Sequence, residues 1–218
     1  MMRAALPIVL ILTTAGCTGS ALYRVVQVPE HAADLYPLSQ SRGGITIAVD
    51  EMRNPGRVQR HFGVDLTQEG ILPVNVVVSN YGKQRVLVKP SDLLLYRGRE
   101  VIDPLPIEMV AAAAKRLHGS LRSNTAEEVD RFFDMSTFRE MVLAPGDSYR
   151  GVMFFAAPAN PAKSDRDRFF TSLSVYLEGG PRLRVGLTNV DTGERLIFGP
   201  FSLSLPANAW SAFSYTSY

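Results

Sequence analysis

Alternation of apolar and polar residues predicts short β-strands over most of the chain. The first clear runs are residues 45–50 and 74–79, and the second closes on an Asn-Tyr-Gly turn at residues 80–82. Further runs follow at residues 93–96, 101–102, 149–155, 173–177, 183–187 and 196–205. Period-two runs of this length, bounded by Gly, Asn, Asp and Pro, are typical of strands. Seven or eight such strands favour a mainly all-β fold, an antiparallel β-sandwich.

One section has a helical pattern instead. Residues 106–117 (PIEMVAAAAKRL) are strong helix formers and end before Gly119. Thr125 and Glu128 have the spacing of a capping box, which predicts the start of a second helix. The sequence therefore predicts a helical insertion at about residues 105–142. Connections of this length are often functional.

The apolar residues of the insertion are its candidate face: Met109, Val110, Leu117, Val129, Phe132 and Phe133. Side chains of this kind must be buried somewhere. They pack against the parent sheet, form a groove for a partner, or cover an apolar ligand, and the sequence leaves these three possibilities open.

The N-terminus has the pattern of a secretory signal. A short start with Arg3 precedes the apolar residues 4–12, small residues follow, and Cys17 comes next. The apolar stretch is too short to span a bilayer, which takes roughly 20 residues. Cys17 is the only cysteine, so no disulfide can form within the chain, and its thiol is available as an anchor.

Residues 14–17 (Thr-Ala-Gly-Cys) resemble the lipobox of bacterial lipoproteins, with threonine where leucine is commoner. In that family the cysteine thiol receives a diacylglycerol, the peptide is cut before the cysteine, and the new amine is acylated, as with palmitate. The resemblance implies that residues 1–16 are a signal peptide and that Cys17 is lipidated. Thr18, in place of an aspartate, implies the outer membrane, with the protein facing the periplasm.

Residues 17–44 contain Pro29, Pro37 and a Ser/Gly-rich stretch, and we expect a lipid-anchored tether there. A flexible chain of this length spans near 30 Å. Residues 45–218 then form the folded domain. Within it, residues 71–82 (ILPVNVVVSNYG) and 143–155 (LAPGDSYRGVMFF) resemble strands of immunoglobulin-like envelope domains. This resemblance implies an immunoglobulin-like sandwich with the helical insertion.

The charge of the chain excludes little beyond nucleic acid. Removal of residues 1–16 from the 218-residue chain leaves 202 residues, with 22 Lys and Arg against 21 Asp and Glu. Nucleic-acid binders usually show a clustered excess of basic residues. Arg53, Arg57 and Arg60 recur near helical spacing; they could contact lipid phosphates, but we expect the solvated edge of a loop or short helix.

Catalytic and metal-binding patterns are weak. Gly146, Asp147 and Ser148 form a triplet that opens the active site of one esterase class, but no histidine follows His118 to accept the serine proton. We expect a turn there. His61 and Asp65 could share a helical face, but a metal needs three or more ligands. We therefore expect no metal, no cofactor and no enzyme.

The C-terminal residues 210–218 carry four aromatic side chains in a Ser/Ala background: Trp210, Phe213, Tyr215 and Tyr218. Exposed aromatics at this density would mark a docking tail. The alternative is a last segment that covers the sandwich.

These patterns together favour a lipid-anchored, non-catalytic structural or interaction module of the bacterial cell envelope. Its expected partners are the membrane and an envelope protein, bound by strand addition or in a groove. The alternative is a periplasmic lipoprotein that binds a small molecule or lipid between the insertion and the sheet. An enclosed apolar cavity under Phe132 and Phe133 would favour that alternative.

Overall fold

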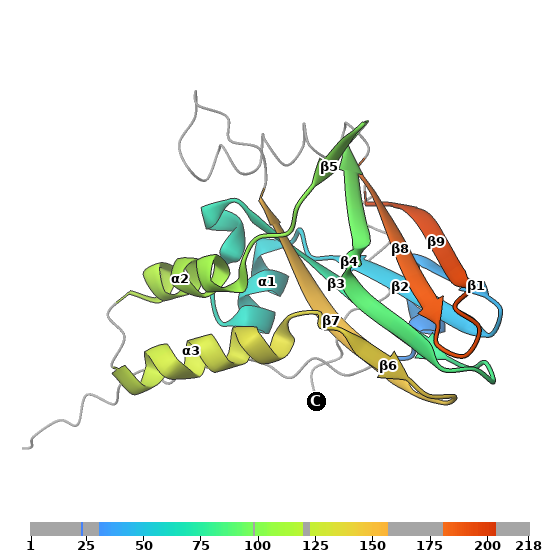
Figure 1. Cartoon of the computed structure of the whole chain (residues 1–218). Coiled ribbons are helices and arrows are strands. Elements are labelled where there is room, and N and C mark those ends of the chain that lie inside the picture. The colour runs from blue at the N-terminus through green and yellow to red at the C-terminus, as the bar shows by residue number, and fades with distance from the viewer. Residues whose placement is uncertain (1–22, 24–30, 98, 120–122, 157–180, 204–218) are drawn as a thin grey trace, which may run out of the picture.

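Four antiparallel strands form the first sheet of the computed structural model, which describes residues 23, 31–97, 99–119, 123–156 and 181–203. The strands are β1 (Ser39–Arg42), β2 (Ile45–Glu51), β3 (Ile71–Asn80) and β7 (Ser148–Ala156), in that order across the sheet (Figure 1). All of β2 and β3 is buried, because both faces of this sheet are covered.

The second sheet has five strands and is also antiparallel. Its main path is β5 (Glu100–Ile102), β4 (Val86–Arg97), β8 (Arg182–Asn189) and β9 (Arg195–Ser202). β6 (Met141–Leu143) pairs with β4 on the same side as β5, but at the other end of β4. The two sheets enclose the main core, to which alternate residues of β2 and β3 contribute, such as Ile47 and Val76.

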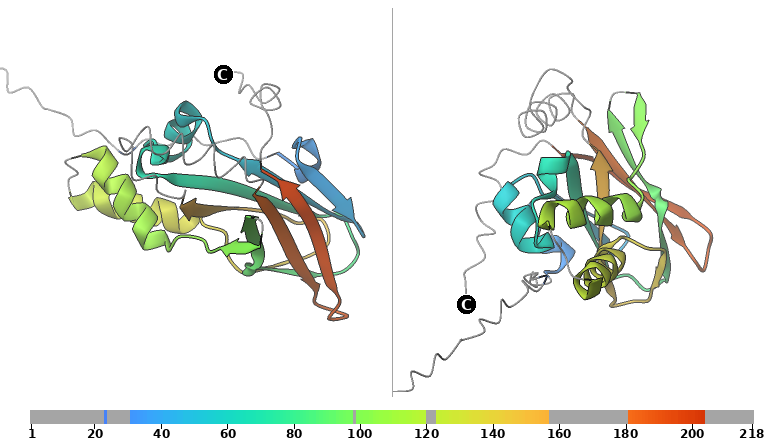
Figure 2. Two further views of the ribbon diagram at one scale, coloured as in Figure 1. Left: turned by 90° about the horizontal axis from the view of Figure 1, so that it is seen from above. Right: turned by 90° about the vertical axis from the view of Figure 1, so that its left-hand side faces the viewer.

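Helices gather at one end of the sheets, on the outer face of the first sheet (Figures 1 and 2). They are α1 (Pro55–Phe62), α2 (Ile107–His118) and α3 (Ser123–Ser136), with the short 3₁₀ helix η2 (Leu66–Glu69). Asn54 caps α1 by accepting a hydrogen bond from the Arg57 N–H at 3.0 Å, and Pro55 occupies the first turn. Gly63 ends the helix in the left-handed region, with φ 71°.

The predicted antiparallel β-rich fold and its helical insertion are confirmed. The predicted helix at residues 106–117 corresponds to α2 within one residue at each end. α3 begins two residues before the predicted capping box, and Thr125 is buried inside it. The hydrophobic pattern of the sequence does not predict α1 or η2. The predicted strand at residues 173–177 lies outside the described residues.

The predicted tether is wrong over its last part, because residues 31–44 belong to the folded unit. Ala33, in the 3₁₀ helix η1 (Ala33–Leu35), packs with Tyr36 on the outer face of the first sheet. β1 pairs with β2 through a hairpin whose two turn residues, Gly43 and Gly44, have φ of 60° and 80°. A Gly-Gly pair with positive φ at both positions is a tight hairpin turn, so these glycines are part of the fold and not of a flexible tether.

Candidate functional site

The apolar face of the insertion is packed into a second core, against the outer face of the first sheet. Five of the six residues predicted as the candidate face lie in or against this core: Val110, Leu117, Val129, Phe132 and Phe133. The sixth, Met109, is 58% exposed on α2. The face therefore attaches α2 and α3 to the sheet, and Met109 alone of the six remains largely open to a partner.

Aromatic rings fill the space beneath the insertion. Phe62 of α1 and Phe133 of α3 stack with ring centroids 5.7 Å apart and planes 9° apart. Phe154 of β7 meets both rings near edge-on, at 5.6 and 5.8 Å. All three side chains are buried. The protein's own side chains thus fill the space beneath the insertion in which an apolar ligand could otherwise bind.

Tyr23 lies against the same helices. Its ring is 5.7 Å from that of Phe132 and 5.9 Å from that of His118. Its hydroxyl donates a hydrogen bond to the backbone carbonyl of Phe62, the last residue of α1. Burial raises the pKa of Tyr23, so this hydroxyl stays protonated and remains a donor.

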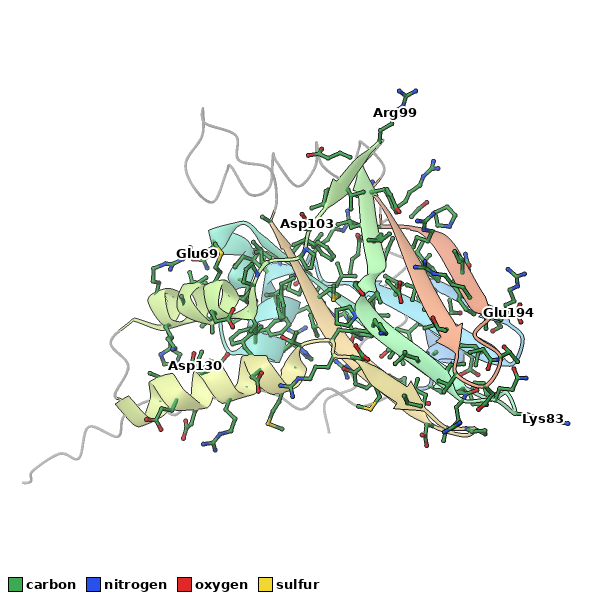
Figure 3. All side chains as sticks on the ribbon, viewed as in Figure 1. Glu69, Lys83, Arg99, Asp103, Asp130 and Glu194 are labelled. Atoms are coloured by element: carbon green, nitrogen blue, oxygen red, sulfur yellow. The ribbon has the colours of Figure 1, made fainter. Side chains whose placement is uncertain are left out.

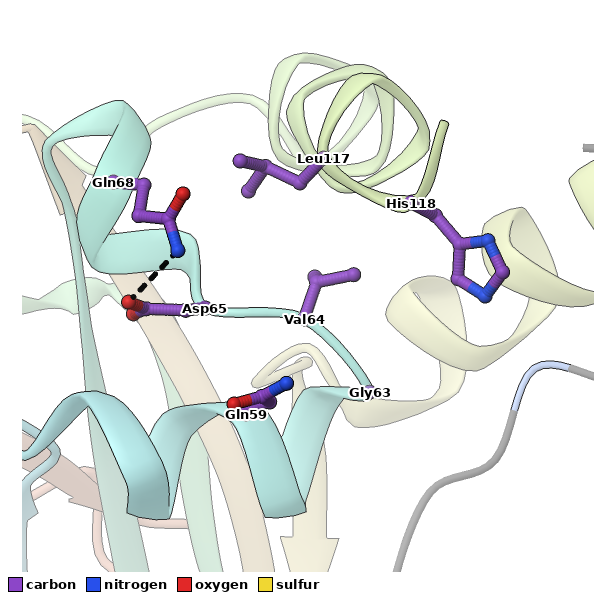
Figure 4. Close-up of a pocket in the computed structure, with 7 residues that line it drawn as sticks. All are labelled: Gln59, Gly63, Val64, Asp65, Gln68, Leu117 and His118. Carbon is purple, nitrogen blue, oxygen red and sulfur yellow. Dashed lines mark hydrogen bonds between the residues drawn. The ribbon is translucent and has the colours of Figure 1, made fainter. Parts of the chain in front are cut away.

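A pocket of about 260 Å³ lies where α1, η2 and α2 meet (Figure 4). Its lining residues are Gln59, Gly63, Val64, Asp65, Gln68, Leu117 and His118. Two helices end here, α1 before Gly63 and α2 at His118, and helix C-termini carry partial negative charge. Asp65 caps η2 by accepting from the Thr67 N–H at 3.1 Å and from Gln68 Nε2 at 3.2 Å. The pocket suits a small polar or cationic group better than an apolar one.

A polar layer lies between α1 and the first sheet. Asp50 of β2 and Asn75 of β3 are opposite one another in the sheet register, and both are buried. Arg57 of α1 pairs with the Asp50 carboxylate through both terminal nitrogens, with Nη1 2.8 Å from Oδ1. Arg150 of β7 donates from Nε to Asn75 Oδ1 at 3.0 Å. These four side chains tie α1 to three strands.

A histidine beside this layer is uncharged. Burial, together with the smaller effect of the charges of Arg150 and Arg57, lowers the pKa of His61 to about 3. The His61 Nδ1 atom is buried without a hydrogen-bond partner. A histidine with this pKa is a weak base, and near pH 7 it holds no acidic proton to donate.

Glu51, the next residue along β2, points to the opposite face of the sheet. Its side chain is buried, and neither carboxylate oxygen has a hydrogen-bond partner. Arg53 Nε lies 2.9 Å from Oε1, without the angle of a hydrogen bond. Burial raises the pKa of Glu51 to about 8, and the Arg53 charge opposes this shift.

The structure corrects the expectation for the three arginines. Arg60 is exposed, as predicted, but Arg57 is paired with a buried carboxylate and Arg53 with Glu51. The signal for this arrangement was the pair Asp50 and Glu51 at the end of an apolar strand. Carboxylates in such a position need basic partners when they are buried.

The predicted histidine candidates lie apart. His61 is on α1, His118 contacts Tyr23, and the ring of His31 is 6.4 Å from that of Tyr36. Asp65 caps η2, and its carboxylate bonds Thr67 and Gln68 instead of His61. Within the part of the chain that the structure describes, no three His, Cys, Asp or Glu side chains are placed to hold a metal ion.

The triplet at residues 146–148 forms the predicted turn. The Asp147 N–H donates to the Ala144 carbonyl at 3.0 Å, and Asp147 Oδ2 accepts from the Ala144 N–H at 2.8 Å. The Ser148 hydroxyl is 2.9 Å from the Ser79 hydroxyl. These contacts place Gly146 and Asp147 in the turn between β6 and β7, and Ser148 at the start of β7.

Two sets of predicted residues lie outside the described residues. They are the lipidation residue Cys17 with its signal segment, and the aromatic residues Trp210, Phe213, Tyr215 and Tyr218. Of the helices in the described ranges, none is long and apolar enough to cross a membrane.

Comparison with known proteins gives distant structural similarity. No protein-family profile matches the chain, and no curated protein matches it. It is similar to a Bacillus subtilis structure described as a "putative lipoprotein (ycdA)", with a TM-score of 0.36 and 13% identity over 74% of this chain and 37% of the other. It is also similar to the yjhA protein of Bacillus subtilis, with a TM-score of 0.36 and 11% identity over 74% of this chain and 95% of the other. The chain thus spans little more than a third of the first of these two structures.

Proposed function

We propose that this protein is a lipid-anchored, non-catalytic interaction module of the bacterial cell envelope, held at the outer membrane and facing the periplasm. The observation that carries the proposal is the sequence at residues 14–17, where the only cysteine of the chain follows a short apolar stretch and three small residues. The double-sheet fold, which we take as an immunoglobulin-like sandwich, is the body that the anchor presents.

An edge of the second sheet is the surface we assign to a protein partner. β6 pairs with β4 at Val86–Val88 and β5 pairs with it at Leu95–Arg97, so no described strand pairs with residues 89–94 on this side. Val101 of β5 and Met141 and Val142 of β6 are between 41% and 48% exposed. Exposed apolar side chains along a sheet edge suit a partner that adds a strand or a loop there.

The engagement of the polar side chains supports a non-catalytic role. Asp65 caps η2, Asp147 closes the turn before β7, Ser148 bonds another hydroxyl, and His61 is partly buried and uncharged. Asp65, Asp147 and Ser148 therefore already have structural roles in the described fold. A general acid or base needs a pKa near the working pH and access to substrate, which His61 does not have.

Substitution of the cysteine tests the anchor. We expect Cys17→Ser to move the protein from the membrane fraction to the soluble fraction and to remove the acyl mass from the intact protein. Thr14→Leu is the matched control, because it brings the sequence closer to the usual lipobox and should keep both. An unchanged membrane fraction for Cys17→Ser, or a wild-type chain without acyl mass, would refute the anchor.

Site-specific photo-crosslinking tests the partner surface. A crosslinking residue at Val142 should capture one recurrent envelope protein in cells, whereas the same residue at Ile197, on β9 and similarly exposed, should not. Deletion of residues 210–218 tests the other candidate surface, the aromatic tail. If the partner binds the tail, the deletion variant should lose the partner and keep its fold. Capture of nothing at Val142 would exclude this edge.

The pocket of about 260 Å³ favours a second function, binding of a small polar molecule by a periplasmic lipoprotein. Leu117 lines the pocket, and Leu117→Trp would fill it. Native mass spectrometry of the extracted protein should then show a bound mass in the wild type and none in the variant. A wild-type protein without bound mass would leave the interaction module as the function.

A further inference from the structure

Tyr23 joins the N-terminal segment to three helices at once. Its ring contacts Phe132 of α3 and His118 of α2, and its hydroxyl bonds the Phe62 carbonyl at the end of α1. The last carbonyls of a helix lack partners within the helix, so an external donor is favourable there. The side chain is partly buried against the second core. Tyr23 is thus packed against the helices at this end of the molecule.

Tyr23 is close in sequence to the proposed lipidation residue. Tyr23 follows Cys17 by only six residues. Six residues span at most about 20 Å even when fully extended. The distance between an acylated Cys17 and the packed Tyr23 is therefore much shorter than a tether of residues 17–44 would allow.

We propose that Tyr23 orients the anchored protein, so that the helical end faces the bilayer and the opposite end of the sheets points away from it. The inference rests on the proposed lipidation of Cys17. Figure 3 shows Glu69 and Asp130 at the helical end and Lys83 and Glu194 at the far end, on the turns that follow β3 and β8. The docked Tyr23 holds the first pair near the lipid surface and leaves the second pair toward the periplasm.

The membrane-facing end is also where the pocket opens between α1, η2 and α2. Its lining residue His118 contacts Tyr23 directly. The edge formed by β5 and β6 belongs to the second sheet, on the other side of the first sheet from these helices. In this orientation the lipid contact and the partner edge lie on different sides of the first sheet.

Energy transfer to labelled lipid tests the orientation. The full lipidated chain is reconstituted in vesicles of phosphatidylethanolamine and phosphatidylglycerol that carry an acceptor dye on the headgroups. Cys17 is the only native cysteine, so a cysteine introduced at exposed Glu127 of α3 or at exposed Glu194 is the single free thiol once Cys17 is acylated. We expect at least twofold higher transfer efficiency from position 127 than from position 194.

Variants of Tyr23 separate the dock from the anchor. Tyr23→Ala should remove most of the difference between the two labels, because the chain that follows Cys17 is then no longer fixed to the helices at position 23. Tyr23→Phe loses only the hydroxyl and should remove part of the difference. Tyr81→Ala, an exposed tyrosine after β3, should leave the difference unchanged. A thermal unfolding curve for Tyr23→Ala confirms that the second core persists; if that variant unfolds, the Tyr23→Phe result decides.

The outcomes distinguish this inference from the proposed function. Lipidated protein on vesicles with equal transfer from both labels would overturn the orientation and leave the anchor intact. The same holds if the label difference is unaltered in Tyr23→Ala. A chain whose Cys17 carries no acyl group, and which does not bind the vesicles, would overturn both.

Discussion

Arg57 of α1 forms a bidentate salt bridge with Asp50 of β2, in which Nη1 is 2.8 Å from Oδ1 and Nη2 donates to Oδ2. Asp50 is 2% exposed. Burial raises the pKa of its carboxyl, and the charges of Arg57 and Arg150 act against that shift. A buried carboxylate in this position depends on its partner, because an unpaired charge in the interior is costly.

The pair predicts a large effect for one arginine and a small one for its neighbour. Arg57→Ala should lower the free energy of unfolding by about 3 kcal/mol, since it leaves the Asp50 charge buried and unpaired. Arg60→Ala, an exposed residue on the same helix, should change it by less than about 0.5 kcal/mol. Urea denaturation of both variants measures the difference. Equal losses of unfolding free energy in the two variants would mean that the Arg57–Asp50 pair is exposed to water in solution.

His61 predicts a loss of stability in acid. Its pKa is about 3 in the fold and near 6.5 in the unfolded chain, so the unfolded state takes up the proton first as pH falls. The free energy of unfolding should therefore decrease as pH falls from about 6.5 toward 3. His61→Gln should reduce this decrease by about 2 kcal/mol at pH 4.5, relative to pH 7. Parallel pH profiles for wild type and variant would contradict the lowered pKa of the partly buried His61.

Glu51 predicts the opposite dependence. Its pKa is raised to about 8, against 4.5 in the unfolded chain, so the folded state keeps the proton longer. This contribution to stability is complete below about pH 4.5 and is lost as pH rises to about 8. Glu51→Gln, which resembles the protonated side chain, should gain about 3 kcal/mol over wild type between pH 5 and pH 8. Exposed Glu127→Gln is the control and should show no such gain. A pH-independent difference between Glu51→Gln and wild type would show that the carboxyl is ionised in the fold.

Local pattern was sufficient for most of the fold. The alternation at residues 45–50 and 74–79 predicts two strands because alternate residues face the main core, and residues 106–117 predict α2 from helix propensity. The pattern missed α1, whose buried residues are only Val58 and Phe62. Its capping signals were present in the sequence, with Asn54 and Pro55 at the start and Gly63 after the end, but they flank a segment with mostly polar residues.

The polar layer could not be predicted in the same way. Asp50 and Asn75 are opposite one another only through the β2–β3 register, and Arg150 reaches them from a strand 75 residues after Asn75. Sequence alone identifies a charged pair at a strand end, not the element that covers it. The contacts of Tyr23 could not be predicted either, because they come from three helices that only the fold brings together.

The stacked pair Phe62 and Phe133 supplies the last prediction, on whether the insertion is core or binding surface. Phe133→Ala should lower the free energy of unfolding by about 4 kcal/mol, because it opens a cavity next to the Phe62 and Phe154 rings. Met135→Ala is the matched control, since Met135 is on the same helix and is 75% exposed, so its loss should be below about 0.5 kcal/mol.

The same two variants separate stability from docking when partner crosslinking is measured beside urea denaturation. A structural insertion requires that Phe133→Ala lowers stability and that neither variant changes crosslinking below the unfolding transition. Loss of crosslinking with full stability in Met135→Ala would place the partner on α3. Full stability in Phe133→Ala would mean that the aromatic cluster is not packed in solution, and that the space beneath α3 is open to a ligand.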